Sequence, residues 1–337
     1  MSQVLGLDVG FGFTKATNGR EYPVFKSVVG EAADAAFAET LLQTRSTLGR
    51  HIEIGGEAFY LGELAEQQSR GRGFTLDQTQ FLAKYGRPLA LSALTPLVES
   101  GQALRVVTGL PVSFFRKHKD GLTAMLQQRH TVTLIKSDGQ KEEKVLNIER
   151  VRVIPQPFGS MFNLMLNDLG KPTSQRFINE KIGVIDVGFR TADYSISDKT
   201  RYSERGSSST DSGISLAFTA LANSLQQQSG VNVELFRLYE AVTKGSIKIK
   251  GKRYDITGLV KQAFQALATK VAGEANRLWS DDWDVDAIVI TGGGGSVLAP
   301  YLQPLLEGEV IPVPTDQDAR LNNVTGYWKY GQHIWPA

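Results

Sequence analysis

The sequence has 337 residues, of which 41% are hydrophobic and 21% charged. This length and this apolar content are enough for about two folded domains, and the composition is not that of a disordered chain. A net charge of +2 provides no strong attraction to nucleic acid or a membrane surface, and the absence of cysteine together with four scattered histidines excludes disulfides and argues against zinc or histidine-triad enzymes. Because no apolar run reaches the ~18 residues of a membrane span and no basic signal-peptide segment opens the chain, we expect a soluble cytoplasmic α/β protein.

The chain opens with an apolar strand, VLGLDV, followed by a turn that contains Gly10 and Gly12 and by a second strand, FTKAT. Residues 22–29 are predicted to form a third strand. Residues 30–104 mix short helical patterns with glycine- and arginine-rich turns, which predicts an exposed inserted subdomain.

The middle of the chain continues with alternating strands and helices. An apolar run bounded by glycine and proline predicts a buried strand at residues 105–111, and a helix is expected over 112–128. Alternating apolar residues predict a strand over 144–155. Because proline is tolerated in a first helical turn, Pro157 is expected to open a helix over 158–169.

The second half repeats this order of elements. Strands are predicted at residues 182–187, 193–197 and 201–205, and a helix at 213–228. The serine-rich stretch SSSTDSG, residues 207–213, has the composition of a loop or helix cap.

A hairpin and a long helix follow. Residues 245–256 alternate in polarity on either side of Lys250-Gly251, which predicts two short strands joined by a turn. Residues 257–279 form the clearest helix of the sequence, with one apolar stripe at Val260, Phe264, Leu267, Val271, Ala275 and Leu278. This stripe is interpreted as core.

The last predicted elements are a strand at 286–291, a turn of four glycines, a helix at 296–306, a strand at 310–313 and a helix at 317–330. The basic hairpin residues Lys244, Lys248, Lys250, Lys252 and Arg253 allow three interpretations: a subunit contact, a DNA-facing patch, or a solvated hairpin whose lysines protect its edge.

An internal repeat is the most informative feature of the sequence. Residues 5–15 read LGLDVGFGFTK and residues 183–193 read GVIDVGFRTAD, so that both copies place DVGF after an apolar strand and a threonine shortly afterwards. Two halves that open with the same strand–turn–strand unit predict two similar domains that face one another.

Each repeat places one carboxylate, Asp8 or Asp186, at a strand end next to backbone N–H donors. Such donors hold phosphate oxygens, while an aspartate holds Mg²⁺ through its waters. A single D-x-G is more often a simple β-turn, but two copies in matched context favour a phosphate site. A P-loop motif is absent, and the turn at Gly10 leads into a strand rather than the helix of a dinucleotide fold.

These motifs resemble those of the actin/Hsp70/sugar-kinase superfamily. LDVGFGFTK resembles its first phosphate motif, DVGFRTAD its second, and ITGGGGSVL its adenosine motif. VIPQPFGSMF is similar to the start of its first connecting helix and NNVTGYWKYG to the tail helix of bacterial and archaeal actin-like proteins, while VTGLPVSFF and GSIKIKGKRYDI resemble the plasmid-segregation branch (ParM/StbA-like).

The resemblance implies an α/β fold, the duplicated two-domain actin-like (ribonuclease H-like) ATPase fold. Domain I would cover residues 1–160 with an inserted subdomain at about 30–104. Domain II would cover residues 161–318 with a subdomain at about 206–280. Residues 319–337 would form a C-terminal helix that packs back on domain I.

The resemblance also implies site residues. Asp8 and Asp186 would hold Mg²⁺ through water, and Gln156 would orient the hydrolytic water; these three are the predicted catalytic residues. The predicted ATP-binding residues are Gly10, Gly12, Phe13, Thr14 and Lys15 in the first loop, Gly188, Phe189, Arg190, Thr191 and Asp193 in the second, and Gly213, Gly292, Gly293, Gly294 and Gly295 elsewhere. Phe189-Arg190 replaces the glycines of many relatives, so Arg190 either contacts a phosphate or points to the surface.

The function implied is an ATPase that binds ATP·Mg²⁺ between two domains and forms dynamic filaments for plasmid or DNA segregation. Its expected partners are further copies of itself and an adaptor bound at a centromere-like DNA site, with no direct nucleic-acid or membrane contact. The alternatives are a small-molecule (sugar or acid) kinase of the same fold and a scaffold of the cell-shape or pilus-assembly kind. We expect no Hsp70-type chaperone, because little sequence follows the last predicted helix.

Overall fold

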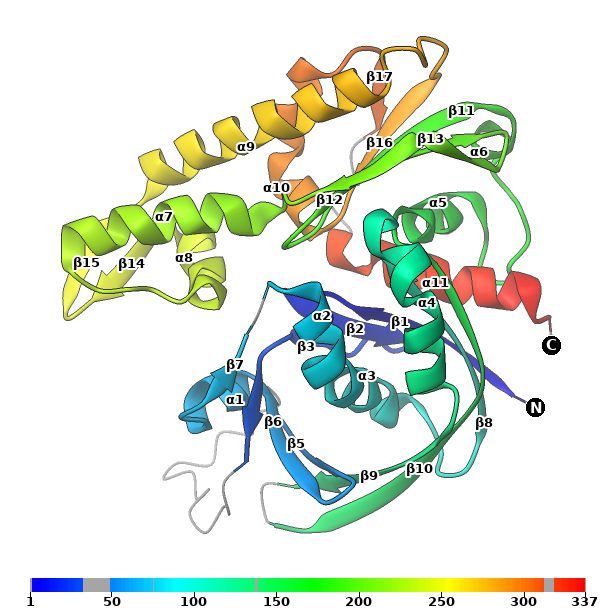
Figure 1. Ribbon diagram of the computed structural model, residues 1–337, viewed down its shortest axis with the longest axis vertical. Helices are drawn as coiled ribbons and strands as arrows, with labels where there is room; N and C mark the ends of the chain where they lie inside the picture. Colours follow the sequence, from blue (N-terminus) through cyan, green and yellow to red (C-terminus); the bar gives the residue numbers. More distant parts are fainter. Residues whose placement is uncertain (1, 33–48, 75, 137–138, 312–317, 337) are drawn as a thin grey trace. The chain divides into compact units, whose positions relative to one another are not determined.

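The computed structural model describes residues 2–32, 49–74, 76–136, 139–311 and 318–336 (Figure 1). These residues form two compact units. The first contains the chain up to Leu110, Phe114–Ser174 and the residues from Leu321 onward, and the second contains Pro111–Ser113 and Gln175–Arg320. Each unit is described on its own below.

The first unit is built on a ten-stranded sheet with the order β3-β2-β1-β8-β10-β9-β5-β6-β4-β7. Its strands are β1 Gln3–Val9, β2 Phe13–Thr17, β3 Val24–Lys26, β4 Val29–Glu31, β5 Gly49–Ile54, β6 Glu57–Gly62, β7 Arg72–Gly73, β8 Ala103–Leu110, β9 Arg129–Ile135 and β10 Lys141–Pro155. Its helices are α1 Glu63–Gln68, α2 Gln78–Gln80, a π-helix Phe81–Gly86, α3 Arg87–Leu94, α4 Val112–Leu126, α5 Pro157–Met165 and α11 Asn322–Ile334. The first two residues of α4, Val112 and Ser113, are counted with the second unit.

The second unit is built on a five-stranded sheet with the order β13-β12-β11-β16-β17 and a separate hairpin. Its strands are β11 Lys181–Val187, β12 Ala192–Asp198, β13 Arg201–Thr210, β14 Ser246–Ile249, β15 Lys252–Asp255, β16 Ala287–Thr291 and β17 Glu309–Ile311. Its helices are α6 Gln175–Asn179, α7 Ile214–Ser229, α8 Leu238–Lys244, α9 Thr257–Leu278 and α10 Gly293–Leu302.

The two sheets share one five-stranded arrangement, β3-β2-β1-β8-β10 in the first unit and β13-β12-β11-β16-β17 in the second. In each, three antiparallel strands are followed by two that run parallel to the third. The register also repeats, because Asp8 lies opposite Lys15 and Asp186 lies opposite Asp193. The sequence repeat is therefore a repeat of structure, and the predicted duplicated α/β fold is confirmed.

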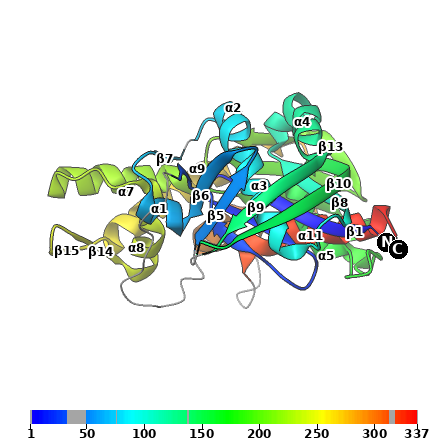
Figure 2. The same ribbon diagram turned by 90° about the horizontal axis from the view of Figure 1, so that it is seen from below.

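The central strands of the first unit are apolar because helices cover both faces of the sheet. Leu5 and Leu7 of β1 and Val106 of β8 have no exposed surface. Helix α3 packs against β1, while α11 packs against β1, β8 and α5, as the proximity of α5, α11, β1 and β8 in Figure 2 illustrates.

Glycines allow α11 to cross α5 closely. A Cβ on Gly326 would collide with the carbonyl oxygen of Gly159, so only hydrogen fits at this crossing. Next to it, Oδ1 of the buried Asn323 accepts hydrogen bonds from the Ser160 N–H at 3.0 Å and the Ser160 hydroxyl at 2.8 Å. The last helix of the chain is thus an integral part of the first unit.

Several elements differ from their predicted limits. The strand expected over 22–29 is two strands, β3 and β4, separated at Ser27. The helix expected over 158–169 ends at Met165, because Asn167 Oδ1 accepts hydrogen bonds from the N–H groups of Leu169 and Lys171 and closes a turn.

Strand β13 continues to Thr210, through serines that the sequence analysis interpreted as a loop or helix cap. Two of these serine hydroxyls donate hydrogen bonds, Ser207 to the Ser203 carbonyl of the same strand and Ser209 to Asp193 of β12.

The helix expected over 296–306 begins three residues earlier, because three of the four glycines form its first turn. The last helix begins at Asn322 rather than at residue 317. Residues 312, 313 and 317 of the predicted elements, like residues 33–48 of the predicted subdomain, lie outside the described residues. Among the helices that the structure describes, none is long and apolar enough to cross a bilayer.

Candidate functional site

The first loop joins β1 to β2 and is closed by a hydrogen bond from Gly10 N to the Phe13 carbonyl, 3.2 Å long. Asp8 at the end of β1 is almost fully buried and lies opposite Lys15, whose Nζ donates a hydrogen bond to Asp8 Oδ2 at 2.5 Å. Lys15 is also buried, so this pair places a carboxylate and its own counter-ion at the base of the loop.

Ser27 supports this loop from behind and was not anticipated from the sequence. Its N–H donates to the Gly12 carbonyl at 3.0 Å and its hydroxyl to the Gly10 carbonyl at 2.5 Å. A hydroxyl has one proton, so the 2.8 Å hydrogen bond between Ser27 and Thr14 is donated by Thr14. These bonds fix the carbonyl groups of both loop glycines toward the protein interior.

The second loop joins β11 to β12 and repeats the first, with a hydrogen bond from Gly188 N to the Thr191 carbonyl at 2.9 Å. Its carbonyl groups accept from the start of α7: Gly213 N donates to Arg190 O, Ile214 N to Gly188 O and Ser215 N to Phe189 O, at 2.7–3.1 Å. A Cβ on Gly213 would collide with Phe189 and Arg190. Glycine at this position therefore allows α7 to hold the loop.

Asp193 is buried beneath the second loop and is bound through both of its oxygens. Oδ1 accepts hydrogen bonds from Val112 N at 2.8 Å and from the Ser209 hydroxyl, and Oδ2 accepts one from the Thr191 hydroxyl at 2.8 Å. Burial raises the pKa of Asp193, while these hydrogen bonds and the charge of Arg190 oppose that rise. These contacts of Asp193 shape the loop, and its predicted role in ATP binding stays a prediction.

Phe189 and Arg190 have different surroundings. The ring of Phe189 is buried in a cluster with Phe218 and Tyr239, at centroid distances of 5.9 and 5.4 Å, so only its backbone is available to a ligand. The Arg190 side chain is 17% exposed and forms a 3.2 Å ion pair with Asp211. The two predicted alternatives for Arg190, a phosphate contact or an outward-pointing side chain, both stay predictions.

The four glycines after β16 pack against the second loop. Gly292 has a φ of +84°, and a Cβ there would collide with Asp186 Oδ1 and the Val187 carbonyl. A Cβ on Gly294 would lie 2.9 Å from the same carbonyl, whereas one on Gly293 would lie 3.0 Å from the Arg320 side chain and one on Gly295 3.3 Å from Ile290. Glycine at 292 and 294 therefore brings the start of α10 against the buried Asp186.

Gln156 immediately precedes α5 in the first unit. Its backbone is fixed, because its N–H donates to the Leu110 carbonyl at 2.8 Å and its carbonyl accepts from Gly159 N at 3.0 Å. Its side-chain amide forms no hydrogen bond with any residue that the structure describes.

The predicted site residues therefore form one group in each unit. Asp8, the first-loop residues and Gln156 belong to the first unit, and Asp186, the second-loop residues, Gly213 and the glycines of α10 belong to the second. The described residues contain no group of three metal-ligating side chains.

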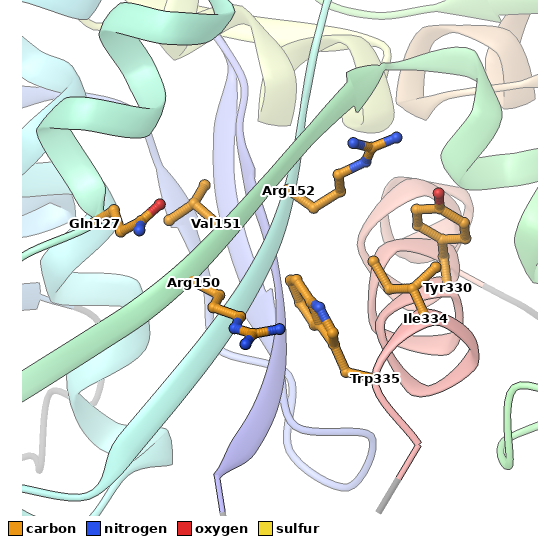
Figure 3. A pocket seen from close by; sticks show the side chains of 7 residues that line it. All are labelled: Gln127, Arg150, Val151, Arg152, Tyr330, Ile334 and Trp335. Atoms are coloured by element: carbon orange, nitrogen blue, oxygen red, sulfur yellow. The ribbon is translucent and has the colours of Figure 1, made fainter.

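A separate hollow of about 380 Å³ lies on the first unit, between β10 and the end of α11 (Figure 3). It is lined by Gln127, Arg150, Val151, Arg152, Tyr330, Ile334 and Trp335, and the two arginines extend from the same strand. None of these described lining residues was predicted to bind nucleotide.

Two family models match successive parts of the chain. Residues 6–159 match the N-terminal domain of actin-like proteins, and residues 184–304 match the C-terminal domain of the archaeal actin homologue, described as MreB-like. These matches contain both loops, and they confirm the resemblance derived from the motifs. No curated protein sequence matches the chain.

Solved structures agree in fold over almost the whole chain. A ParM protein in a 15-stranded filament from Clostridium botulinum is 23% identical with a TM-score of 0.81, and the match covers 98% of this chain and 99% of that chain. A non-polymerisable quadruple mutant of a ParM has the same identity and coverage with a TM-score of 0.80. An archaeal actin homologue in complex with ADP is 20% identical with a TM-score of 0.80, and covers 98% of this chain and 99% of that chain.

Proposed function

We propose that this chain, which belongs to the actin-like proteins, is an ATPase that binds ATP·Mg²⁺ through the loops of both units and polymerises in that state. One observation carries the proposal. Two strand–turn–strand loops of equal length and equal register each present a buried aspartate at the same position. A pair of matched loops with inward-fixed carbonyl groups leaves backbone N–H groups for phosphate oxygens.

The loops are suited to bind phosphate without rearrangement. Ser27 fixes the carbonyl groups of the first loop, and the start of α7 fixes those of the second. Phosphoryl transfer depends mainly on positioning and on preorganised charge, and groups that are already oriented bind the phosphates at a lower entropic cost.

We assign the roles of the site residues accordingly. Lys15 balances Asp8 in the ligand-free protein and contacts phosphate when nucleotide is bound, while Asp186 orients the waters of the ion. Mg²⁺, when bound, neutralises charge on the phosphate oxygens. Gln156 orients the attacking water through its side-chain amide, which does not titrate and so positions the water without acting as a base.

The proposed cellular role is segregation of plasmid or other DNA by dynamic filaments, with an adaptor protein between filament and DNA. The ParM structures of similar fold support it, since one of them is a filament. The near-neutral net charge of the whole chain supports an indirect rather than a direct contact with DNA.

The experiment is high-speed sedimentation combined with phosphate release, comparing ATP, ADP and a non-hydrolysable ATP analogue. We expect pelleting with ATP and with the analogue, and phosphate release with ATP alone. Phosphate transfer only in the presence of a sugar or an acid would instead identify a small-molecule kinase. Pelleting that does not depend on nucleotide would favour a scaffold. Asp186→Ala is the matched variant, and unchanged phosphate release in it would show that the second loop is not the phosphate site.

A further inference from the structure

The hairpin β14–β15 carries an unbalanced positive charge. Lys248, Lys250, Lys252 and Arg253 are all exposed, and none of them forms a salt bridge with the residues that the structure describes. Lys248 and Arg253 lie directly opposite one another in the register, an arrangement that destabilises a strand pair through like-charge repulsion. An anionic partner would relieve this repulsion.

The turn between α9 and β16 carries negative charge and an exposed aromatic side chain, and so complements the positive hairpin. Trp283 at its tip is 89% exposed, the largest exposure among the big apolar side chains of the described residues. It is flanked by Asp281 and Asp284, whose side chains are 86% and 54% exposed. Asp281 lies 3.9 Å from Arg205 and Asp284 lies 2.5 Å from Lys181, but these two cations are shared by three acids, Asp281, Asp282 and Asp284, so the turn keeps a negative charge. An exposed tryptophan beside carboxylates suits a cationic partner, because its ring face attracts ammonium and guanidinium groups.

The turn that presents Trp283 is already ordered. Asp282 is buried, and its Oδ1 accepts hydrogen bonds from Lys181 Nζ at 2.8 Å and from Arg205 at 2.5 Å. Two backbone hydrogen bonds, from Asp282 N to Trp279 O at 2.8 Å and from Val285 N to Asp282 O at 3.1 Å, close the turn. A rigid aromatic side chain loses little entropy when it is covered by a partner.

The two surfaces lie at opposite ends of one helix. The hairpin ends two residues before α9 begins, and the Trp283 turn follows the end of α9, as Figure 1 shows. The 22 residues of α9 separate them by about 33 Å. Two complementary surfaces that far apart on one unit do not pair within a molecule. They can pair head to tail between molecules, and such a contact forms open filaments when it does not close into a ring.

We infer that the hairpin cations of one copy of this chain bind the Trp283 turn of the next copy, and that this contact forms the longitudinal interface of a filament. The inference rests on the proposed polymerisation and adds to it the residues that make the contact. Trp283 inserts among the hairpin cations, and Asp281 and Asp284 neutralise them. The salt bridges at the rim make assembly sensitive to ionic strength.

Two complementary variants test this contact. The hairpin variant carries Lys250→Glu and Lys252→Glu, and the turn variant carries Trp283→Ala and Asp281→Lys. With the non-hydrolysable ATP analogue, each variant alone should require at least about 30-fold more protein to pellet than the unmodified chain, the effect of losing one interface hot spot. An equimolar mixture should give a 1:1 complex by analytical ultracentrifugation, because each variant retains the surface that the other has lost.

Lys261→Glu with Lys270→Glu is the matched control, since both lysines are exposed on α9 between the two surfaces. This control should pellet like the unmodified chain, and all variants should bind nucleotide equally. If the hairpin or turn variant pellets normally, if the control fails equally, or if the mixture forms no complex, the assigned interface is wrong. If the unmodified chain itself does not pellet with any nucleotide, the failure lies in the proposed function.

Discussion

Replacing Ser27 with alanine would isolate the contribution of one buried hydroxyl to the first loop. The change removes the hydrogen bond to the Gly10 carbonyl and the one from the Thr14 hydroxyl. Each of these hydrogen bonds contributes about 1 kcal/mol net to the free energy of unfolding, and a buried group that is left without its hydrogen-bond partner adds to the loss. We expect the free energy of unfolding of the first unit to fall by about 2–3 kcal/mol.

Ser92→Ala is the matched control, because Ser92 is fully buried in the same unit and its hydroxyl has no hydrogen-bond partner among the residues that the structure describes. Urea denaturation followed by circular dichroism should show an unchanged or higher free energy of unfolding for this control, since the change removes a buried hydroxyl that makes no hydrogen bond. Equal stabilities of the Ser27→Ala and Ser92→Ala proteins would refute the assigned role of Ser27. If the loop also binds phosphate, the Ser27 variant alone should lose ATP affinity, by about tenfold for 1.4 kcal/mol of loop disorder.

Three further predictions concern the remaining loop residues. Burial raises the folded-state pKa of Asp193, so the stability that its protonated carboxyl group contributes is complete below the unfolded-state pKa and is lost as the pH rises through the folded-state pKa. In urea titrations from pH 4 to 8, the free energy of unfolding of the unmodified chain should therefore fall relative to that of Asp193→Asn. A difference between the two proteins that stays constant with pH would contradict this. Gly292→Ala should lower the free energy of unfolding by at least about 2 kcal/mol, because the new Cβ would collide with Asp186 at a φ of +84°. A melting temperature within about 1 °C of that of the unmodified chain would be incompatible with this collision. Gln156→Ala should slow phosphate release about 100-fold while nucleotide affinity and unfolding free energy stay unchanged, since its amide bonds no described residue; a loss of affinity would point to a binding role instead.

The local elements were predictable where one residue type dictates the backbone. Lys250-Gly251 was predicted to be the turn of a hairpin, and both residues have the positive φ, 47° and 84°, that such a turn requires. The apolar stripe of α9 likewise identified its buried face, with Phe264, Leu267 and Val271 in the core. The repeated DVGF motif identified the paired loops because the same short unit recurs in both halves.

The sequence analysis missed features that depend on contacts between distant segments. Nothing next to Ser27 in the sequence indicates that its hydroxyl supports a loop 17 residues earlier. The serines of β13 were interpreted as a loop or helix cap from their composition, but pairing with β12 and the hydrogen bond from Ser209 to Asp193 make them a strand. The packing of Gly292 and Gly294 against Val187 was also not anticipated, whereas their contact with nucleotide stays a prediction.

The shared register of the two hairpins has an electrostatic consequence. The position opposite the aspartate is occupied by a cation in the first unit, Lys15, and by a second acid in the second unit, Asp193. The same scaffold position thus gives Asp8 a counter-ion from its own neighbouring strand, whereas it places another carboxyl group across from Asp186. Two halves that match in backbone therefore differ in local charge, since the Asp8–Lys15 pair is neutral and the residue opposite Asp186 is another acid. A metal cation that arrives with its ligand would stabilise the half that contains Asp186 more than the other half.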